Sequence, residues 1–228
     1  MLSVVKTTER THARELRARG WSIKEIQQEL GVSRSSVSLW VRDVPLTPEQ
    51  QAALIERIRL GPMRAGIASA ARARDRRAAF QRHGRQRARE GSALYAAGCM
   101  LYWAEGGKRR NSALLTNADP QVVAFFARFL REEFAVPDEA MSVYCNLFAD
   151  HLERQREIEQ FWLDTLQLPP TALRKSIVNV YSKYSQKKRD NKLPYGTCRL
   201  VVHSTEIVQT IYGSIQEYGG FDRPEWLD

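Results

Sequence analysis

The sequence has 228 residues, a net charge of +9 and a pI near 9.7. This length suffices for two small domains, and the charge indicates a polyanionic partner: nucleic acid first, an anionic membrane surface as the alternative. No cysteine pair has metal-ligand spacing, which argues against a zinc site. The sequence shows no signal-peptide pattern and no membrane-spanning apolar run, so we expect a cytoplasmic, nucleoid-associated protein.

Residues 1–45 are predicted to form a helix-turn-helix DNA-binding domain. "TERTHARELRARG" is an amphipathic helix that ends at Gly20, and Ser22 caps a second helix, "IKEIQQEL", with Glu25 as its capping-box partner. A turn at Gly31 leads to a third helix, "RSSVSLWVRD", which Ser33 caps. In a helix-turn-helix the last helix enters the major groove of DNA. The alternative is a helical hairpin that serves packing alone.

The third helix carries short polar and cationic side chains on its outer face. Serines allow close approach to the base edges, and an arginine can hydrogen-bond guanine or phosphate. The DNA contacts predicted for this helix are Ser33, Arg34, Ser35, Ser36, Ser38 and Arg42.

Residues 46–91 are predicted to form an arginine- and alanine-rich helical linker. Eleven arginines stand against one acid, Asp75, between residues 57 and 89, so this segment carries a charge of about +10. We expect the helix to be interrupted at Gly61-Pro62, Gly66 and Gly84. We interpret the linker as an arm along the phosphates, with contacts at Arg72, Arg76, Arg77 and Arg85. A solvated linker helix whose charges do little is the alternative.

Residues 92–228 are predicted to form an α+β domain with helices on one face of a mostly antiparallel sheet. The expected helices are 92–105, 121–134, 153–166 and 205–219, and the expected strands are 112–116, 141–148, 176–184 and 196–203. The second face of such a sheet is free, and its polar and basic positions suit a DNA groove. Contacts are predicted there at Lys183, Lys187, Lys188, Arg189 and Arg199, with a plain solvated face as the alternative.

One motif, "CMLYWAEG" from Cys99 to Gly106, joins an apolar helix to a single acid and a glycine. With it, residues 93–218 resemble a single-copy LAGLIDADG homing-endonuclease-like domain, in which a small-residue helix ends in an acid and a saddle-shaped sheet carries DNA. "LLTNADPQVVAFF" is similar to the strand-to-helix segment of such proteins. "GWSIKEIQQELGVSRSSVSLWVRDVPLT" resembles the helix-turn-helix fused to these domains in bacteria and phages.

This resemblance places Glu105 at the family's metal-binding acid. It implies that an active member hydrolyses phosphodiesters with Mg²⁺ held by carboxylates at two helix ends. Because one motif copy is present, such a site would need a homodimer with both Glu105 residues near the two-fold axis. Relatives of the sporulation-regulator type keep the fold and bind DNA without cutting it. Without a metal, Glu105 would cap a backbone amide or pair with Lys108 or Arg109.

Together these features predict a sequence-specific, double-stranded-DNA-binding transcriptional regulator that needs no cofactor for binding. The C-terminal domain is expected to form a homodimer and to contact phosphates through Lys108, Arg109 and Arg110. The alternative is a Mg²⁺-dependent homodimeric endonuclease of the same fold, and a third is a recombinase accessory or transposon-encoded protein. A membrane partner is not expected, because the basic segment lacks a bulky apolar face.

Overall fold

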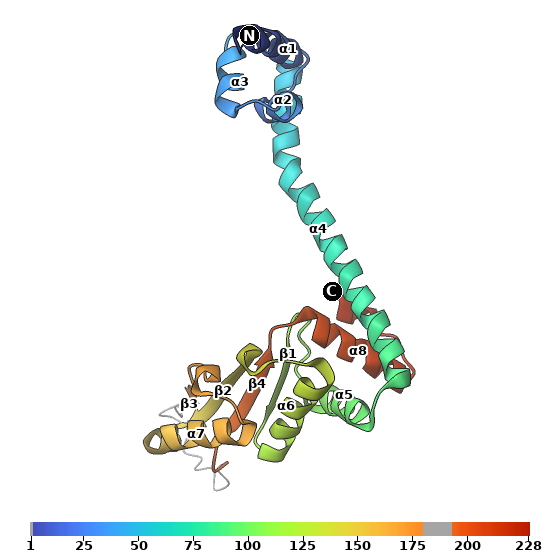
Figure 1. Ribbon diagram of the computed structural model, residues 1–228, viewed down its shortest axis with the longest axis vertical. Coiled ribbons are helices and arrows are strands. Elements are labelled where there is room, and N and C mark those ends of the chain that lie inside the picture. The colour runs from blue at the N-terminus through green and yellow to red at the C-terminus, as the bar shows by residue number, and fades with distance from the viewer. Residues whose placement is uncertain (1, 180–192) are drawn as a thin grey trace. The chain divides into compact units, whose positions relative to one another are not determined.

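The computed structural model describes residues 2–179 and 193–228, and the chain divides into two compact units, 1–72 and 73–228. Helix α4, Pro48–Glu90, begins in the first unit and ends in the second (Figure 1). The segment predicted as a separate linker, 46–91, is therefore divided between the two units. None of the described helices is long and apolar enough to cross a membrane.

Three helices open the first unit: α1 (Leu2–Ala18), α2 (Ile23–Leu30) and α3 (Arg34–Trp40). The predicted capping box of α2 is confirmed, because Ser22 Oγ accepts from Glu25 N at 3.1 Å and Glu25 Oε2 accepts from Ser22 N at 2.7 Å. Gly31 then adopts a left-handed conformation with φ of 65°, which ends α2 and turns the chain into α3.

A bidentate ion pair fastens the end of α3 to α1. Arg14 donates to the two carboxylate oxygens of Asp43 at 2.6 and 2.9 Å, and its Nη1 also donates to Trp40 O at 2.8 Å. Ile26 of α2 and Val37 of α3 are fully buried in the apolar core between the helices. Apolar packing along the inner face of α3 and the ion pair between Arg14 and Asp43 therefore fix the position of this helix.

The start of α4 packs on these helices and belongs to the first unit. Gln50 Nε2 donates to Ala18 O at 2.9 Å. About two turns further on, Arg57 donates to Gly20 O at 2.9 Å and to Glu25 Oε1 at 3.1 Å. These bonds satisfy carbonyls at the end of α1, so the unit extends beyond the predicted boundary at residue 45.

Helix α4 continues through the residues that were predicted to interrupt it, and this prediction is wrong. Pro62 removes one backbone N–H and costs about 3 kcal/mol in a helix interior. The neighbouring Ala, Arg and Gln residues are strong helix formers, and their summed preference favours a continuous helix. A Cβ placed at Gly61 or Gly66 would have no atom within 4 Å, so these glycines serve no close contact.

The second unit is built on a four-stranded sheet in the order β1-β4-β2-β3. Its strands are β1 (Ala113–Asn117), β2 (Met141–Phe148), β3 (Ile177–Asn179) and β4 (Thr197–Val202). β4 is antiparallel to both β1 and β2, and β3 is parallel to β2, so the predicted α+β class with a mostly antiparallel sheet is confirmed. Ser176 directly precedes β3, and residues 180–184 of the predicted strand 176–184 lie outside the described residues.

Four helices pack against one face of this sheet, as Figure 1 shows for α6 and α7. They are α5 (Ala93–Glu105), α6 (Pro120–Phe134), α7 (Gln155–Leu166) and α8 (Thr205–Gly219). Short 3-10 helices lie at Asp138–Ala140, Ala149–Arg154, Pro170–Ala172 and Pro224–Leu227. Along β2, Val143, Cys145 and Leu147 are fully buried, while Tyr144 and Asn146 between them are partly exposed. This alternation shows that the helices cover one side of the sheet.

The second half of α4 lies against α8 with direct backbone contact at two glycines. A Cβ added to Gly84 would overlap Thr210 O, and a Cβ added to Gly213 would overlap Gln81 O. Each glycine therefore admits the backbone of the other helix. The glycine that was expected to break α4 instead allows it to pack.

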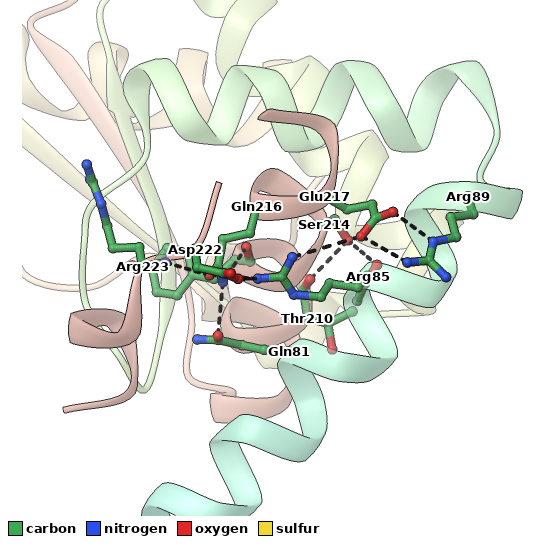
Figure 2. A network of polar contacts seen from close by, with 11 residues as sticks. Gln81, Arg85, Arg89, Thr210, Ser214, Gln216, Glu217, Asp222 and Arg223 are labelled. Atoms are coloured by element: carbon green, nitrogen blue, oxygen red, sulfur yellow. Dashed lines mark hydrogen bonds and ion pairs between the residues drawn. The ribbon is translucent and has the colours of Figure 1, made fainter. Parts of the chain in front are cut away.

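Buried amides and peripheral ion pairs complete this contact, and Figure 2 shows Gln81, Gln216, Arg85 and Asp222 joined in one network. Gln81 Nε2 donates to Gln209 Oε1 at 2.7 Å, and Gln81 Oε1 accepts from Gln216 Nε2 at 2.9 Å. At the edge, Arg85 pairs with Asp222. Because the amides are buried and paired, they stabilise one arrangement of the two helices over others.

We expect Gly84→Ala to lower the free energy of unfolding of the second unit by about 1–3 kcal/mol, because the new methyl group must displace α8. Urea unfolding followed by tryptophan fluorescence measures the change. Gly66→Ala, in the same helix but in open space, is the matched control and is expected to be neutral or stabilising by less than about 1 kcal/mol. Equal losses for the two substitutions would contradict the backbone contact.

The ion pair of the first unit predicts a pH dependence of stability. Hydrogen bonding to Arg14 lowers the pKa of Asp43 from 3.8 to about 2. Because the folded pKa lies below the unfolded one, the stabilisation is complete above a pH of about 4 and is lost as the pH falls towards about 2. Thermal unfolding of wild type and Asp43→Asn across this window tests it. The variant is expected to lose part of the pH dependence, and parallel curves would refute the assignment.

Candidate nucleic-acid interface

The outer face of α3 presents most of the side chains that were predicted to contact DNA. Arg34, Ser35 and Ser38 are exposed on the helix, and Arg42 is exposed just after it. The face combines cations with short hydroxyls, which are groups that bond phosphates and base edges.

Two of the predicted serine contacts also serve the helix itself. Ser33 Oγ accepts from Ser36 N at 3.1 Å and so caps α3. The hydroxyls of Ser35 and Ser36 each lie 2.9 Å from Ser33 Oγ, and Ser36 is partly buried. Ser33 and Ser36 thus have a structural role at the start of the helix, which leaves Ser35 and Ser38 as the more open hydroxyls.

The same face contains an apolar side chain that the sequence analysis did not single out. Leu39 is 62% exposed, four residues after Ser35 and so on the same side of the helix. Its neighbours Val37 and Val41 are buried in the core. An apolar residue in an amphipathic helix is expected on the buried face. The helical spacing places Leu39 on the opposite side from Val37 and Val41, and this position could have predicted its exposure from the sequence.

The arginines of α4 fall into two groups. Arg77 is only 9% exposed and donates from Nε to Leu227 O at 2.6 Å, and burial lowers the pKa of its guanidinium. Arg85 pairs with Asp222 and donates to Gln216 Oε1 at 3.0 Å. These two predicted DNA contacts are therefore engaged within the second unit. The other two, Arg72 and Arg76, are exposed and form no ion pair with the described residues.

Further arginines of the helix follow the same division. Three are held by carboxylates of the second unit: Arg74 by Asp228, Arg87 by Glu133 and Arg89 by Glu217. Arg82 is exposed like Arg76, again with no ion pair in the described part of the chain. Arg82 was not among the predicted contacts, and it is exposed directly after the buried Gln81.

The loop after α5 contains one cation with a structural role and two that are free. Lys108 Nζ donates to the carbonyl oxygens of Tyr102, Trp103 and Gly106 at 3.2, 2.9 and 2.6 Å. A lysine in this position satisfies the last carbonyls of a helix, and desolvation lowers the pKa of the amine. Arg109 and Arg110 are exposed, and their guanidinium groups make no ion pair with any described residue.

Glu105 is exposed at the last position of α5. Its Oε2 lies 3.4 Å from Asn117 Nδ2, and it forms no ion pair with Lys108 or Arg109 within the described structure. No group of three or more His, Cys, Asp or Glu side chains in residues 2–179 and 193–228 is placed to hold a metal ion. One carboxylate facing an amide is an incomplete donor set for Mg²⁺, so this chain alone does not fit such a site.

The uncovered face of the sheet carries one of the five cations predicted for it. Arg199 on β4 lies opposite Thr116 and Tyr144, and its guanidinium carbon is 4.6 Å from the centre of the Tyr144 ring. Its Nε is buried and has no hydrogen-bond partner in the described structure. The other four, Lys183, Lys187, Lys188 and Arg189, lie outside the described residues.

Comparison with known families assigns the N-terminal helices. Residues 5–44 match a family model for a homeodomain-like domain, and these residues include α2, α3 and most of α1. No curated protein and no solved structure matches the chain. The first unit thus contains a homeodomain-like helix-turn-helix domain, which indicates that the protein binds DNA.

Proposed function

We propose that the protein is a sequence-specific double-stranded DNA-binding protein that acts as a transcriptional regulator. The observation that carries the proposal is the homeodomain-like domain, whose last helix exposes Arg34, Ser35 and Ser38. In this arrangement the outer face of α3 enters the major groove and bonds base edges. The ion pair between Arg14 and Asp43 holds α3 in place, so the side chains proposed to contact DNA keep a fixed geometry.

Phosphate contacts supply the affinity that does not depend on sequence. Four exposed arginines that form no ion pair within the described chain, Arg72 and Arg76 on α4 and Arg109 and Arg110 after α5, suit this role. Arg77, Arg85 and Lys108 hold parts of the second unit together, so we assign them no direct role on DNA.

We further propose that the C-terminal domain, 92–228, is LAGLIDADG-like and forms a homodimer through α5. The exposed positions Ala93, Ala97 and Ala104 and the partly exposed Met100 follow helical spacing, and no charge interrupts α5 before Glu105. Small apolar residues at this spacing let two helices approach closely. A two-fold dimer would bind two copies of a half-site, as regulators with helix-turn-helix domains do.

A Mg²⁺-dependent endonuclease of the same fold is the second candidate, and the exposure of Glu105 at the end of α5 favours it. If α5 lies at a dimer axis, two copies would bring two such carboxylates together and complete a donor set that one chain lacks. Bound Mg²⁺ would stabilise the charge that develops on a phosphodiester during hydrolysis. Cleavage assays separate this candidate from the regulator.

Arg34→Ala is expected to relax base preference by about 1–3 kcal/mol at one position of the site, because it removes hydrogen bonds to a base edge. Sites would first be selected from random duplexes with the wild-type chain, and binding to a selected and to a scrambled duplex would then be compared. Arg76→Ala is the matched control: it should weaken binding to both duplexes alike and reduce the salt slope by about 1. Unchanged selectivity in Arg34→Ala would count against base reading by α3.

We expect the wild-type protein to bind its selected site in the presence of Mg²⁺ without nicking it, and Glu105→Gln to bind equally well. A supercoiled plasmid that carries the site reports a single nick with high sensitivity. Mg²⁺-dependent nicking that disappears in Glu105→Gln would instead establish the endonuclease.

A further inference from the structure

Leu39 is the one large apolar side chain among residues 7–47 that the structure leaves exposed. At 62% exposure it contributes little to the core of the first unit, which Ile26, Val37 and Val41 form on the opposite side of the helices. A single exposed leucine is common on protein surfaces and needs no explanation by itself. Leu39 lies, however, on the outer face of α3, among the side chains proposed to contact DNA.

The surroundings of Leu39 indicate what this side chain would contact. It follows Ser35 by one turn, and Arg42 is exposed three residues further on. The rest of the face is polar or cationic, so an apolar protein partner would leave the cations without counter-charges. Duplex DNA provides phosphates for the arginines and polar base edges for the serines.

The major groove offers one kind of apolar group at its base edges, the 5-methyl group of thymine. We propose that Leu39 contacts such a methyl group, so that the target of this protein includes a thymine at a fixed position. This inference rests on the proposed function. Four residues of helix rise by about 6 Å, which places the thymine about two base pairs from the base nearest Ser35.

The test replaces each thymine of a selected site in turn with deoxyuridine, which lacks only the 5-methyl group. Wild-type binding should fall about fourfold at one position, the effect expected for one methyl group removed from an apolar contact. Leu39→Ala should bind the thymine and deoxyuridine duplexes equally. Ile55→Ala removes a side chain of the same unit that is also exposed, at 59%, and should keep the wild-type preference.

Leu39→Met keeps an apolar side chain of similar volume and should keep the preference for thymine, which shows that the contact rather than the fold is being measured. If wild type selects a site but tolerates deoxyuridine at every position, the assignment to Leu39 is overturned and the proposed function stands. The assignment is likewise overturned if Leu39→Ala retains the full loss. Failure of the wild-type chain to select any site would overturn both.

Discussion

The contact between the backbones of α4 and α8 at Gly84 and Gly213 sets the rotation of α4 within the second unit. That rotation decides which arginines of the helix face α8 and the chain's last residues and which face solvent. Arg77 faces inward and reaches Leu227 O, while Arg76, its neighbour in the sequence, is exposed. A change of 100° in the rotation of the helix would exchange these two roles.

The polar character of this contact explains why it is specific. Gln81 uses its amide nitrogen on Gln209 and its amide oxygen on Gln216, so both halves of a buried group are satisfied in one register. An apolar interface would tolerate a small slide of one helix, whereas a slide here would leave buried amides unpaired at a cost of about 1–3 kcal/mol each. The first unit uses a related device, because Arg14 satisfies both Asp43 and the carbonyl of Trp40 at the end of α3.

Features set by neighbouring residues could be predicted from the sequence, and features set by distant ones could not. The capping box spans the four residues from Ser22 to Glu25, and the alternation in β2 spans eight residues. The difference between Arg76 and Arg77 depends on segments about 150 residues apart. The capping of α5 by Lys108 is also a local feature, because a lysine two residues beyond Gly106 is within reach of the last carbonyls of the helix. It was therefore predictable from the sequence.

Most of the positive charge in the segment 57–89 is engaged within the protein. Between residues 57 and 89 the sequence carries eleven arginines, but seven of them bond carboxylates or carbonyls of the described structure. Arg64, Arg72, Arg76 and Arg82 are the arginines of this segment left without such a partner in the described chain.

Each phosphate that a cation neutralises contributes about 0.9 to the slope of log affinity against log salt. Four free arginines would therefore contribute a slope of about 4, less than half of what eleven would give. Most of the arginines in the basic segment thus have structural partners: Arg57 binds the first unit, Arg59 binds Glu56 of the same helix, and the other five bind the second unit. Under the proposed function, the contribution of this segment to DNA affinity comes from the four arginines without such a partner in the described chain.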